Sequence, residues 1–259
     1  MKQLSRIQII QITDTHLFAN EEQKLSGIKT AKSLQTVVKN IEKLDTLPDF
    51  LILTGDLSED QTPESYKYLK DLLNRLRISV YWLPGNHDNL YTMQQLLTDD
   101  AYICSQKSFL CGDWQFLLLN STVPGCVHGQ ISSEQLIWLD KQLRSSEQQT
   151  LIALHHPPFK IDSEWLDSYG LRNPEELFAV IDCYPQIKLV IFGHIHQEFE
   201  FERRGVKYLG TPSTSIQFKP KTSKFSLDNK QPGFRLLNLY SDGTWKTEVN
   251  RIVYEDSKA

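Results

Sequence analysis

The sequence has few cysteines and no excess of positive charge, and both absences narrow the classes of protein that it can encode. Four cysteines occur among 259 residues, with no Cys-x-x-Cys pair and no cysteine beside a histidine. This argues against a cysteine-based zinc module and favours small apolar side chains in a reducing compartment. The formal net charge of −4 predicts no broad basic surface, so we expect no binding to nucleic acid.

Long apolar runs are missing as well. No stretch approaches the roughly 18 apolar residues that cross a membrane. The N-terminal stretch MKQLSRIQIIQITD lacks the apolar core and the cleavage site of a signal peptide. We therefore expect a cytoplasmic protein without a membrane partner. The sequence leaves open whether it is a monomer or a homodimer.

Short apolar runs alternate with helical patterns along the chain. Strands are predicted at 7–12, 49–56, 78–83, 150–156 and 188–194, and helices at 26–44, 63–77, 132–144 and 173–184. This alternation is typical of an α/β sheet. The apolar segments 107–112 and 114–120, together with a tail that alternates and turns at Asp242-Gly243, predict a second sheet packed on the first. The polar segment 221–233 is expected to be a loop.

Polar side chains gather where five of the predicted strands end. In open α/β sheets, the carboxyl ends of the strands border the ligand crevice, so we expect these side chains to converge. One histidine at a strand end is usually a satisfied polar residue, but five such clusters in one chain predict a metal site. The clusters are Asp14-Thr15-His16, Gly55-Asp56, Gly85-Asn86-His87-Asp88, His155-His156 and Gly193-His194-Ile195-His196.

The donor types indicate the kind of metal. Carboxylate, amide and imidazole groups without a thiolate argue against a structural zinc site, and many imidazoles argue against Mg²⁺ or Ca²⁺. Mixed nitrogen and oxygen donors suit Fe, Mn, Co or Zn in a catalytic site. Seven donors exceed the needs of one ion, so we expect two ions sharing an aspartate, an arrangement that suits displacement at phosphorus. The donors are Asp14, His16, Asp56, Asn86, one of His155 and His156, His194 and His196.

The stretch GNHD (85–88) assigns different roles to neighbouring residues. Asn86 is expected to bind a metal through its amide oxygen. His87 has no place in either coordination sphere, so we expect it to face the substrate as a general acid or a phosphate clamp. Asp88 is predicted to orient His87 through a carboxylate–imidazole hydrogen bond, and Gly85 to allow a sharp turn.

The order D-x-H, G-D, G-N-H-D, H and G-H-x-H resembles the calcineurin-like metallophosphoesterases. The stretches QITDTHLF, LPGNHDN, HHPP, FGHIHQ and TPSTSIQFKP resemble in particular the bacterial class III cyclic-nucleotide phosphodiesterases of the CpdA type. The resemblance covers nearly the whole chain. It implies a four-layer αββα sandwich of the metallo-dependent phosphatase type, formed as a single domain over residues 1–259.

The resemblance also implies a ligand set. It places Asp14, His16, Asp56 and His196 on a first metal ion, and Asp56, Asn86, His155 and His194 on a second. Asp56 would bridge the ions, and His155 rather than His156 would be the ligand. Fe²⁺ or Mn²⁺ is expected, with Co²⁺ or Zn²⁺ as alternatives. The residues expected to contact the substrate are His16, Asp56, Asn86, His87, His155 and His196.

The implied activity is hydrolysis of 3′,5′-cyclic AMP to 5′-AMP, by in-line attack of a hydroxide held between the ions and protonation of the leaving oxygen by His87. The alternative is another diester or pyrophosphate hydrolase on the same core, such as a glycerophosphodiesterase. A non-catalytic scaffold is disfavoured because all seven donors are present. Purple acid phosphatases carry a tyrosine three residues after the bridging aspartate; here that residue is Glu59. The five tryptophans are interpreted as packing residues.

Overall fold

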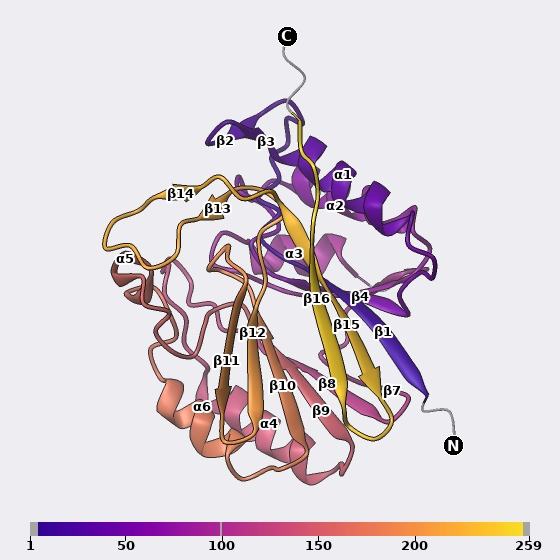
Figure 1. Cartoon of the computed structure of the whole chain (residues 1–259), viewed down its shortest axis with the longest axis vertical. Coiled ribbons are helices and arrows are strands. Elements are labelled where there is room, and N and C mark those ends of the chain that lie inside the picture. The colour runs from indigo at the N-terminus through magenta and orange to yellow at the C-terminus, as the bar shows by residue number, and fades with distance from the viewer. Residues whose placement is uncertain (1–4, 99, 256–259) are drawn as a thin grey trace.

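Two six-stranded sheets form the centre of the computed structural model, which describes residues 5–98 and 100–255 (Figure 1). In order across the first sheet, the strands are β16 (Trp245–Arg251), β15 (Gly233–Tyr240), β1 (Arg6–Ile12), β4 (Phe50–Thr54), β5 (Ser79–Leu83) and β6 (Ile103–Cys104). Those of the second sheet are β11 (Phe199–Arg203), β12 (Val206–Gly210), β10 (Ile187–Phe192), β9 (Gln149–Ala153), β8 (Trp114–Leu118) and β7 (Ser108–Cys111).

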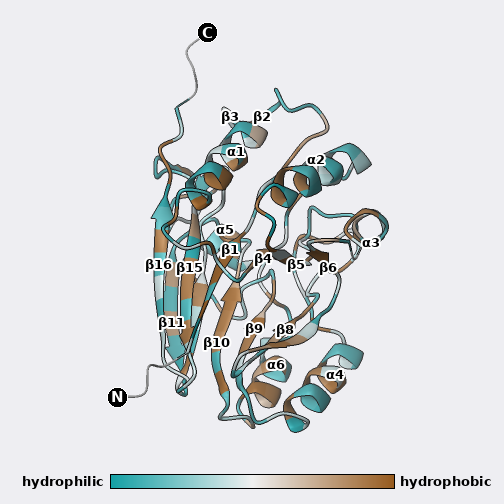
Figure 2. Cartoon of the chain, turned by 90° about the vertical axis from the view of Figure 1, so that its right-hand side faces the viewer, coloured by the Kyte–Doolittle hydropathy of each residue, from teal (hydrophilic) through white to brown (hydrophobic). Residues whose placement is uncertain are grey.

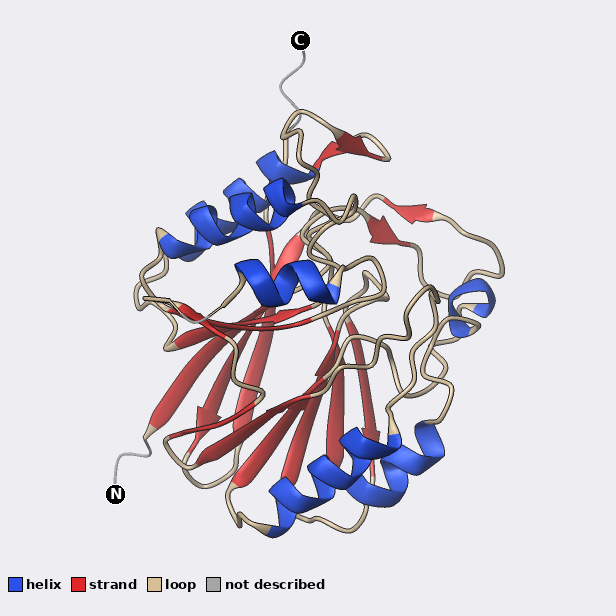
Figure 3. Cartoon of the chain, turned by 180° about the vertical axis from the view of Figure 1, so that it is seen from behind, coloured by secondary structure: helices blue, strands red, loops and turns tan. Residues whose placement is uncertain are grey.

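Helices cover the outer face of each sheet, which gives the four layers of an αββα sandwich (Figures 2 and 3). The helices are α1 (Thr30–Ile41), α2 (Pro63–Asn74) and α3 (Leu90–Leu96) on the first sheet, and α4 (Ser133–Arg144), α5 (Glu164–Asp167) and α6 (Pro174–Ile181) on the side of the second. The predicted fold class and architecture are therefore confirmed.

Alternation along β1 shows how the sequence builds these layers. Successive side chains of a strand point to opposite faces. Ile9 packs between the two sheets, with Phe116 and Leu151 of the second sheet. Its neighbour Ile10 packs outward, under Leu34 of α1. The central strands are thus buried on both faces, which explains why they read as continuous apolar runs.

Two helices begin at capping side chains, and several helix boundaries differ from the prediction. Thr62 and Ser132 cap α2 and α4 by accepting hydrogen bonds from the backbone N–H groups three residues on, those of Ser65 and Gln135. The helix predicted at 26–44 is shorter, because Lys24–Leu25 (β2) and Ile28–Lys29 (β3) first form a small hairpin.

The predicted loop at 221–233 is wrong in part. Leu227–Asp228 (β14) pairs with Gln217–Phe218 (β13), and β15 already begins at Gly233. Two-residue strands carry no periodic pattern, so they cannot be seen in the sequence. The strand β6 has two residues and the helix α5 has four, so neither is long enough to show a periodic pattern, and neither was predicted. No helix in the described ranges is long and apolar enough to cross a membrane.

Parallel pairing decides where the strand ends meet. In the first sheet, β1, β4 and β5 run parallel to one another, and in the second sheet β8, β9, β10 and β12 do so. The carboxyl ends of these strands therefore lie along one edge of each sheet. The His155 ring after β9 donates a hydrogen bond from Nδ1 to the Thr54 carbonyl oxygen at the end of β4, at 2.8 Å, so the two edges meet.

Candidate metal centre

The five polar clusters predicted from the sequence do converge at these strand ends. The backbone N–H of His194, after β10, donates to the carboxylate of Asp14, after β1, at 3.1 Å. Asp14 and His155 are fully buried, and His16, Asp56, His194 and His196 expose 5% or less of their surface. Buried charged and imidazole side chains need polar partners, and here these side chains are partners for one another.

The first group of side chains is Asp14, His16 and His196, whose ligand atoms all lie within 4.8 Å of one another. The Nε2 atoms of His16 and His196 are 3.1 Å apart, and His196 Nε2 is 3.4 Å from Asp14 Oδ1. The Nδ1 atom of His196 donates to the Ile216 carbonyl oxygen at 2.9 Å. That bond leaves Nε2 as the unprotonated nitrogen, aimed into the group as a ligand would be.

The second group is Asn86, His155 and His194. Asn86 Oδ1 lies 3.2 Å from His155 Nε2 and 3.0 Å from His194 Nδ1, and these two nitrogens are 3.3 Å apart. Because His155 donates from Nδ1 to Thr54, its other ring nitrogen, Nε2, faces the group. The other ring nitrogen of His194, Nε2, is buried and has no hydrogen-bond partner among the described residues.

Asp56 joins the two groups. Its Oδ2 lies 3.3 Å from His155 Nε2 and 3.9 Å from His16 Nε2. Burial alone would raise the pKa of Asp56, but His155, His87 and His16 hold it well below its usual range. The carboxyl group is therefore an anion that faces ligand atoms from both sides.

These atoms fit a bound cation. In each group, nitrogen and oxygen atoms that can act as metal ligands lie 3.0–3.4 Å apart and face one another. A cation between them would contact several of these atoms at once. The donor chemistry, imidazole with carboxylate and amide, is that of transition-metal sites.

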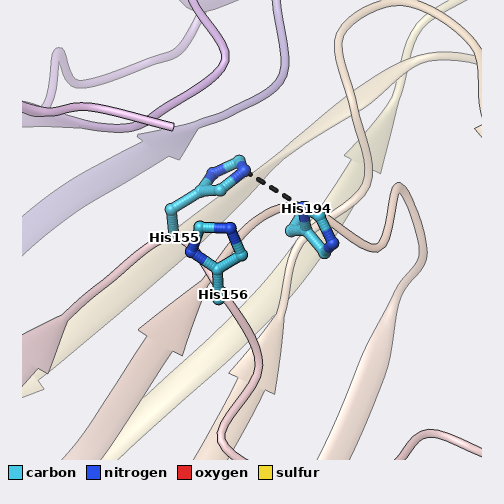
Figure 4. A group of neighbouring side chains, drawn as sticks. All are labelled: His155, His156 and His194. Carbon is cyan, nitrogen blue, oxygen red and sulfur yellow. Dashed lines mark hydrogen bonds between the residues drawn. The ribbon is translucent and has the colours of Figure 1, made fainter. Parts of the chain in front are cut away.

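His156 also lies beside His155 and His194 (Figure 4), but both of its ring nitrogens have other partners. Nδ1 is 2.8 Å from Ser121 Oγ, and Nε2 donates to the Val127 carbonyl oxygen at 3.0 Å. Burial and the neighbouring His155 lower the pKa of His156 to about 3. His156 is thus a neutral ring that supports the 121–129 loop, which agrees with the choice of His155 as the ligand.

The hydrogen bond predicted between Asp88 and His87 does not form. The Asp88 carboxylate instead accepts hydrogen bonds from three backbone N–H groups, those of Leu57, Ser58 and Gly85, at 2.9–3.0 Å. The Tyr66 hydroxyl adds a fourth at 3.1 Å. Asp88 therefore ties the turn after β5 to the turn after β4, and it does not orient the imidazole beside it.

Glu59 takes the role that was assigned to Asp88. One of its oxygens, Oε2, lies 2.7 Å from His16 Nδ1 and 3.0 Å from His87 Nδ1. Burial opposes the charge of Glu59, but the hydrogen bonds from the two rings lower its pKa to about 2. Burial also opposes the charge of His87, but the hydrogen bond to Glu59 raises the pKa of that ring to about 9. From the sequence, Glu59 was singled out only because purple acid phosphatases have a tyrosine at this position.

The backbone at the site is unusual in conformation. Asp14, His16, Asp56, His194 and His196 all have positive φ, between 46° and 69°. Residues other than glycine rarely adopt this region, and they persist there only when the surroundings hold them. Left-handed residues at these strand ends turn the side chains back toward one another, which an extended strand would not do.

Comparison with known proteins identifies the family to which the chain belongs. Residues 7–198 match the calcineurin-like phosphoesterases. A 3′,5′-cyclic-nucleotide phosphodiesterase of a Nostoc species is 52% identical over 96% of this chain and 93% of its own. The 3′,5′-cyclic adenosine monophosphate phosphodiesterase CpdA of Escherichia coli is 42% identical over 96% of this chain and 90% of its own. A dimetal phosphatase from Danio rerio has a similar fold, with a TM-score of 0.62, 15% identity, and coverage of 95% and 99% of the two chains.

Proposed function

Since the chain belongs to the calcineurin-like phosphoesterase family, we propose that it is a metal-dependent phosphodiesterase that hydrolyses 3′,5′-cyclic AMP to 5′-AMP. The observation that carries the proposal is the buried set of donors in two groups that share Asp56. The substrate is proposed from the names of the relatives that are 52% and 42% identical over nearly the whole chain.

The proposed cofactor is a pair of divalent transition-metal ions. Asp14, His16, Asp56 and His196 would hold the first, and Asp56, Asn86, His155 and His194 the second. Fe²⁺ or Mn²⁺ fits this mixture of donors, with Co²⁺ or Zn²⁺ as alternatives. When bound, such a pair neutralises the charge that develops on the phosphoryl oxygens and activates a water molecule for attack at phosphorus.

His87 is proposed as the general acid. Its side chain is 39% exposed, whereas the ligand rings around it are buried, so it faces the space where a substrate would lie. The bond from Nδ1 to Glu59 keeps a proton on that nitrogen and leaves Nε2 to approach the leaving ribose oxygen. Glu59 is a positioning residue in this scheme, because it holds both the acid and the metal-side ring of His16.

Three other expectations accompany this proposal. We propose that the chain forms a single domain, that it acts in the cytoplasm and that it works as a monomer or a homodimer. The contacts to substrate proposed for His16, Asp56, Asn86, His155 and His196 follow from their place at the ions.

A substrate panel tests the proposal. Metal-reconstituted protein is assayed by kcat/KM on cyclic AMP, cyclic GMP, a glycerophosphodiester, a nucleoside diphosphate sugar and a simple monoester, with Asp56→Ala as the inactive control. Cyclic AMP should be the best substrate. If a glycerophosphodiester or a pyrophosphate exceeds it by an order of magnitude, the proposed substrate is wrong while the metal centre stands.

A further inference from the structure

A cavity of about 500 Å³ opens at the carboxyl ends of β5 and β8, and none of the proposed ligands lines it. Leu83 and Pro84 at the end of β5 line it, and so do Leu118 and Asn120 at the end of β8. Pro84 is two residues before Asn86. Consecutive Cα atoms are 3.8 Å apart, so less than 8 Å of chain separates this wall from a proposed ligand.

In the second sheet, too, the cavity lies at strand ends that precede proposed ligands. Leu118 pairs with Ala153 in β9, which is two residues before His155. Both walls of the cavity therefore end where the ligand turns begin. A volume of this size falls in the range of small-molecule pockets, 300–1,000 Å³. We propose, on the basis of the proposed function, that this cavity is the nucleobase site and that it selects adenine over guanine.

The lining suits a flat, uncharged heterocycle. Leu83, Leu90 and Leu118 give apolar surface, and the half-buried Trp138 of α4 gives an aromatic ring on which a base can stack. Trp138 was interpreted as a packing residue from the sequence, and its inner side does pack under the second sheet.

The polar groups of the lining favour adenine. Gln94 and Gln106 line the cavity with exposed side chains, and neither side chain makes a hydrogen bond to another described residue. A side-chain amide pairs its donor and acceptor with the N6 and N7 edge of adenine, whereas guanine is recognised chiefly by arginine or lysine. The lining includes no arginine, and the one lysine, Lys107, already donates to the Trp82 carbonyl oxygen and lies 3.4 Å from the centre of the Trp82 ring.

A second aromatic surface next to the ions is less suitable. Phe218 stacks on the His196 ring, with centroids 4.0 Å apart, and Phe225 packs against Phe218. The pocket beside His196 and Phe218 has a volume of about 10 Å³, which is room for about one water molecule. Phe218 is therefore a support for the ligand ring.

The test compares substrates with and without a base. Metal-loaded protein is assayed on cyclic AMP, cyclic GMP and methyl 4-nitrophenyl phosphate, a diester without a nucleobase. Trp138→Ala should lower kcat/KM for cyclic AMP about tenfold or more, mainly through KM, because stacking on an aromatic ring is lost. Gln94→Leu should reduce the preference for cyclic AMP over cyclic GMP. Activity on the small diester should stay within about twofold in both variants.

Two matched variants control for nonspecific damage. Gln95→Leu alters the neighbouring exposed amide of α3, which does not line the cavity, and Phe225→Ala alters the other aromatic surface. Both should leave cyclic AMP turnover unchanged. If Trp138→Ala does not fold, Trp138→Phe and Gln94→Leu are assayed in its place.

Three results would overturn the assignment of the cavity: equal losses on cyclic AMP and on the small diester, no loss in Trp138 and Gln94 variants, or a loss with Phe225→Ala instead. Failure of the proposed function looks different. In that case the wild-type protein cleaves methyl 4-nitrophenyl phosphate and shows no turnover of cyclic AMP.

Discussion

Replacing Glu59 by glutamine tests the link between the metal centre and the proposed acid. The change keeps the size of the side chain and removes the negative charge that His16 and His87 share at 2.7 Å and 3.0 Å. An amide oxygen can still accept one of the two hydrogen bonds, but it holds the proton on His87 less strongly. We expect kcat for cyclic AMP to fall about 10–100-fold, the usual cost of losing a carboxylate behind a metal-bound histidine.

Two contributions make up that loss, and a second substrate separates them. Because His16 is a proposed metal ligand, loss of its contact with Glu59 should weaken metal binding and so act on every phosphodiester. The contact with His87 affects proton donation, which a nitrophenolate leaving group does not need. The loss for methyl 4-nitrophenyl phosphate therefore measures the metal contribution alone. His87→Ala sets the upper limit for the acid contribution, about 10²–10⁴-fold on cyclic AMP.

A double-mutant cycle completes the assay. We would measure kcat and bound metal for the wild type, Glu59→Gln, His87→Ala and the double variant, with Glu64→Gln as a control that removes an exposed carboxylate from α2. Once His87 is absent, Glu59→Gln should cost cyclic AMP only what it costs the nitrophenyl ester. Fully additive losses on cyclic AMP would refute a positioning role for Glu59.

The remaining predictions concern the ions and the sandwich. Asp56→Ala should remove both ions, whereas Asn86→Ala should weaken mainly one; elemental analysis that finds a single ion in fully active protein would contradict the paired site. Phe116 is fully buried between the sheets, with the Phe50 and Phe109 rings 4.9 Å and 5.0 Å away. Phe116→Ala should therefore lower the free energy of unfolding by about 3–5 kcal/mol in urea denaturation. Leu110→Ala, at a side chain that is 62% exposed, should change it by less than about 0.5 kcal/mol.

The sequence predicted the convergence of the site because strand ends carry a local signal. An apolar run followed by Asp-x-His or Gly-Asn-His can be recognised without knowing what lies opposite, and parallel pairing then brings the runs together. The partners behind the ligands carry no such signal. Glu59 lies in a turn and resembles any surface glutamate, and its contacts with His16 and His87 depend on how two turns pack.

For Glu59 a real contact was missed, whereas for Asp88 a contact was predicted that does not form. Its position next to His87 suggested a contact along the chain, but neighbours in a turn point in different directions. Its carboxylate is surrounded by four donors: two in the turn after β4, one in its own turn and one in α2. A carboxylate with several donors within reach takes the backbone N–H groups, because buried N–H groups left without acceptors are costly.

The motif glycines show that spacing between the turns matters as much as ligand type. Gly85 was expected to allow a sharp turn, but it does not have positive φ. A Cβ atom there would lie 2.2 Å from Asp56 Oδ1, and one at Gly193 would lie 2.1 Å from Thr13 Oγ1 and 2.9 Å from Asp14 Oδ2. Each glycine therefore makes room for the carboxylate of a different strand.

This close approach explains how the site is assembled. Two carboxylates of the site are packed against the backbone of the turns that carry the imidazole side chains: Asp56 accepts from the His87 N–H at 2.8 Å, and Asp14 from the His194 N–H at 3.1 Å. Since the neighbouring turn fixes Oδ1 of Asp56 and both oxygens of Asp14, the positions of these carboxylates relative to the imidazoles are fixed as well. A side chain larger than hydrogen at either glycine would separate the turns and with them the donor atoms. The glycines thus determine the distances between the donor atoms of the candidate metal centre, although they offer no donor to it.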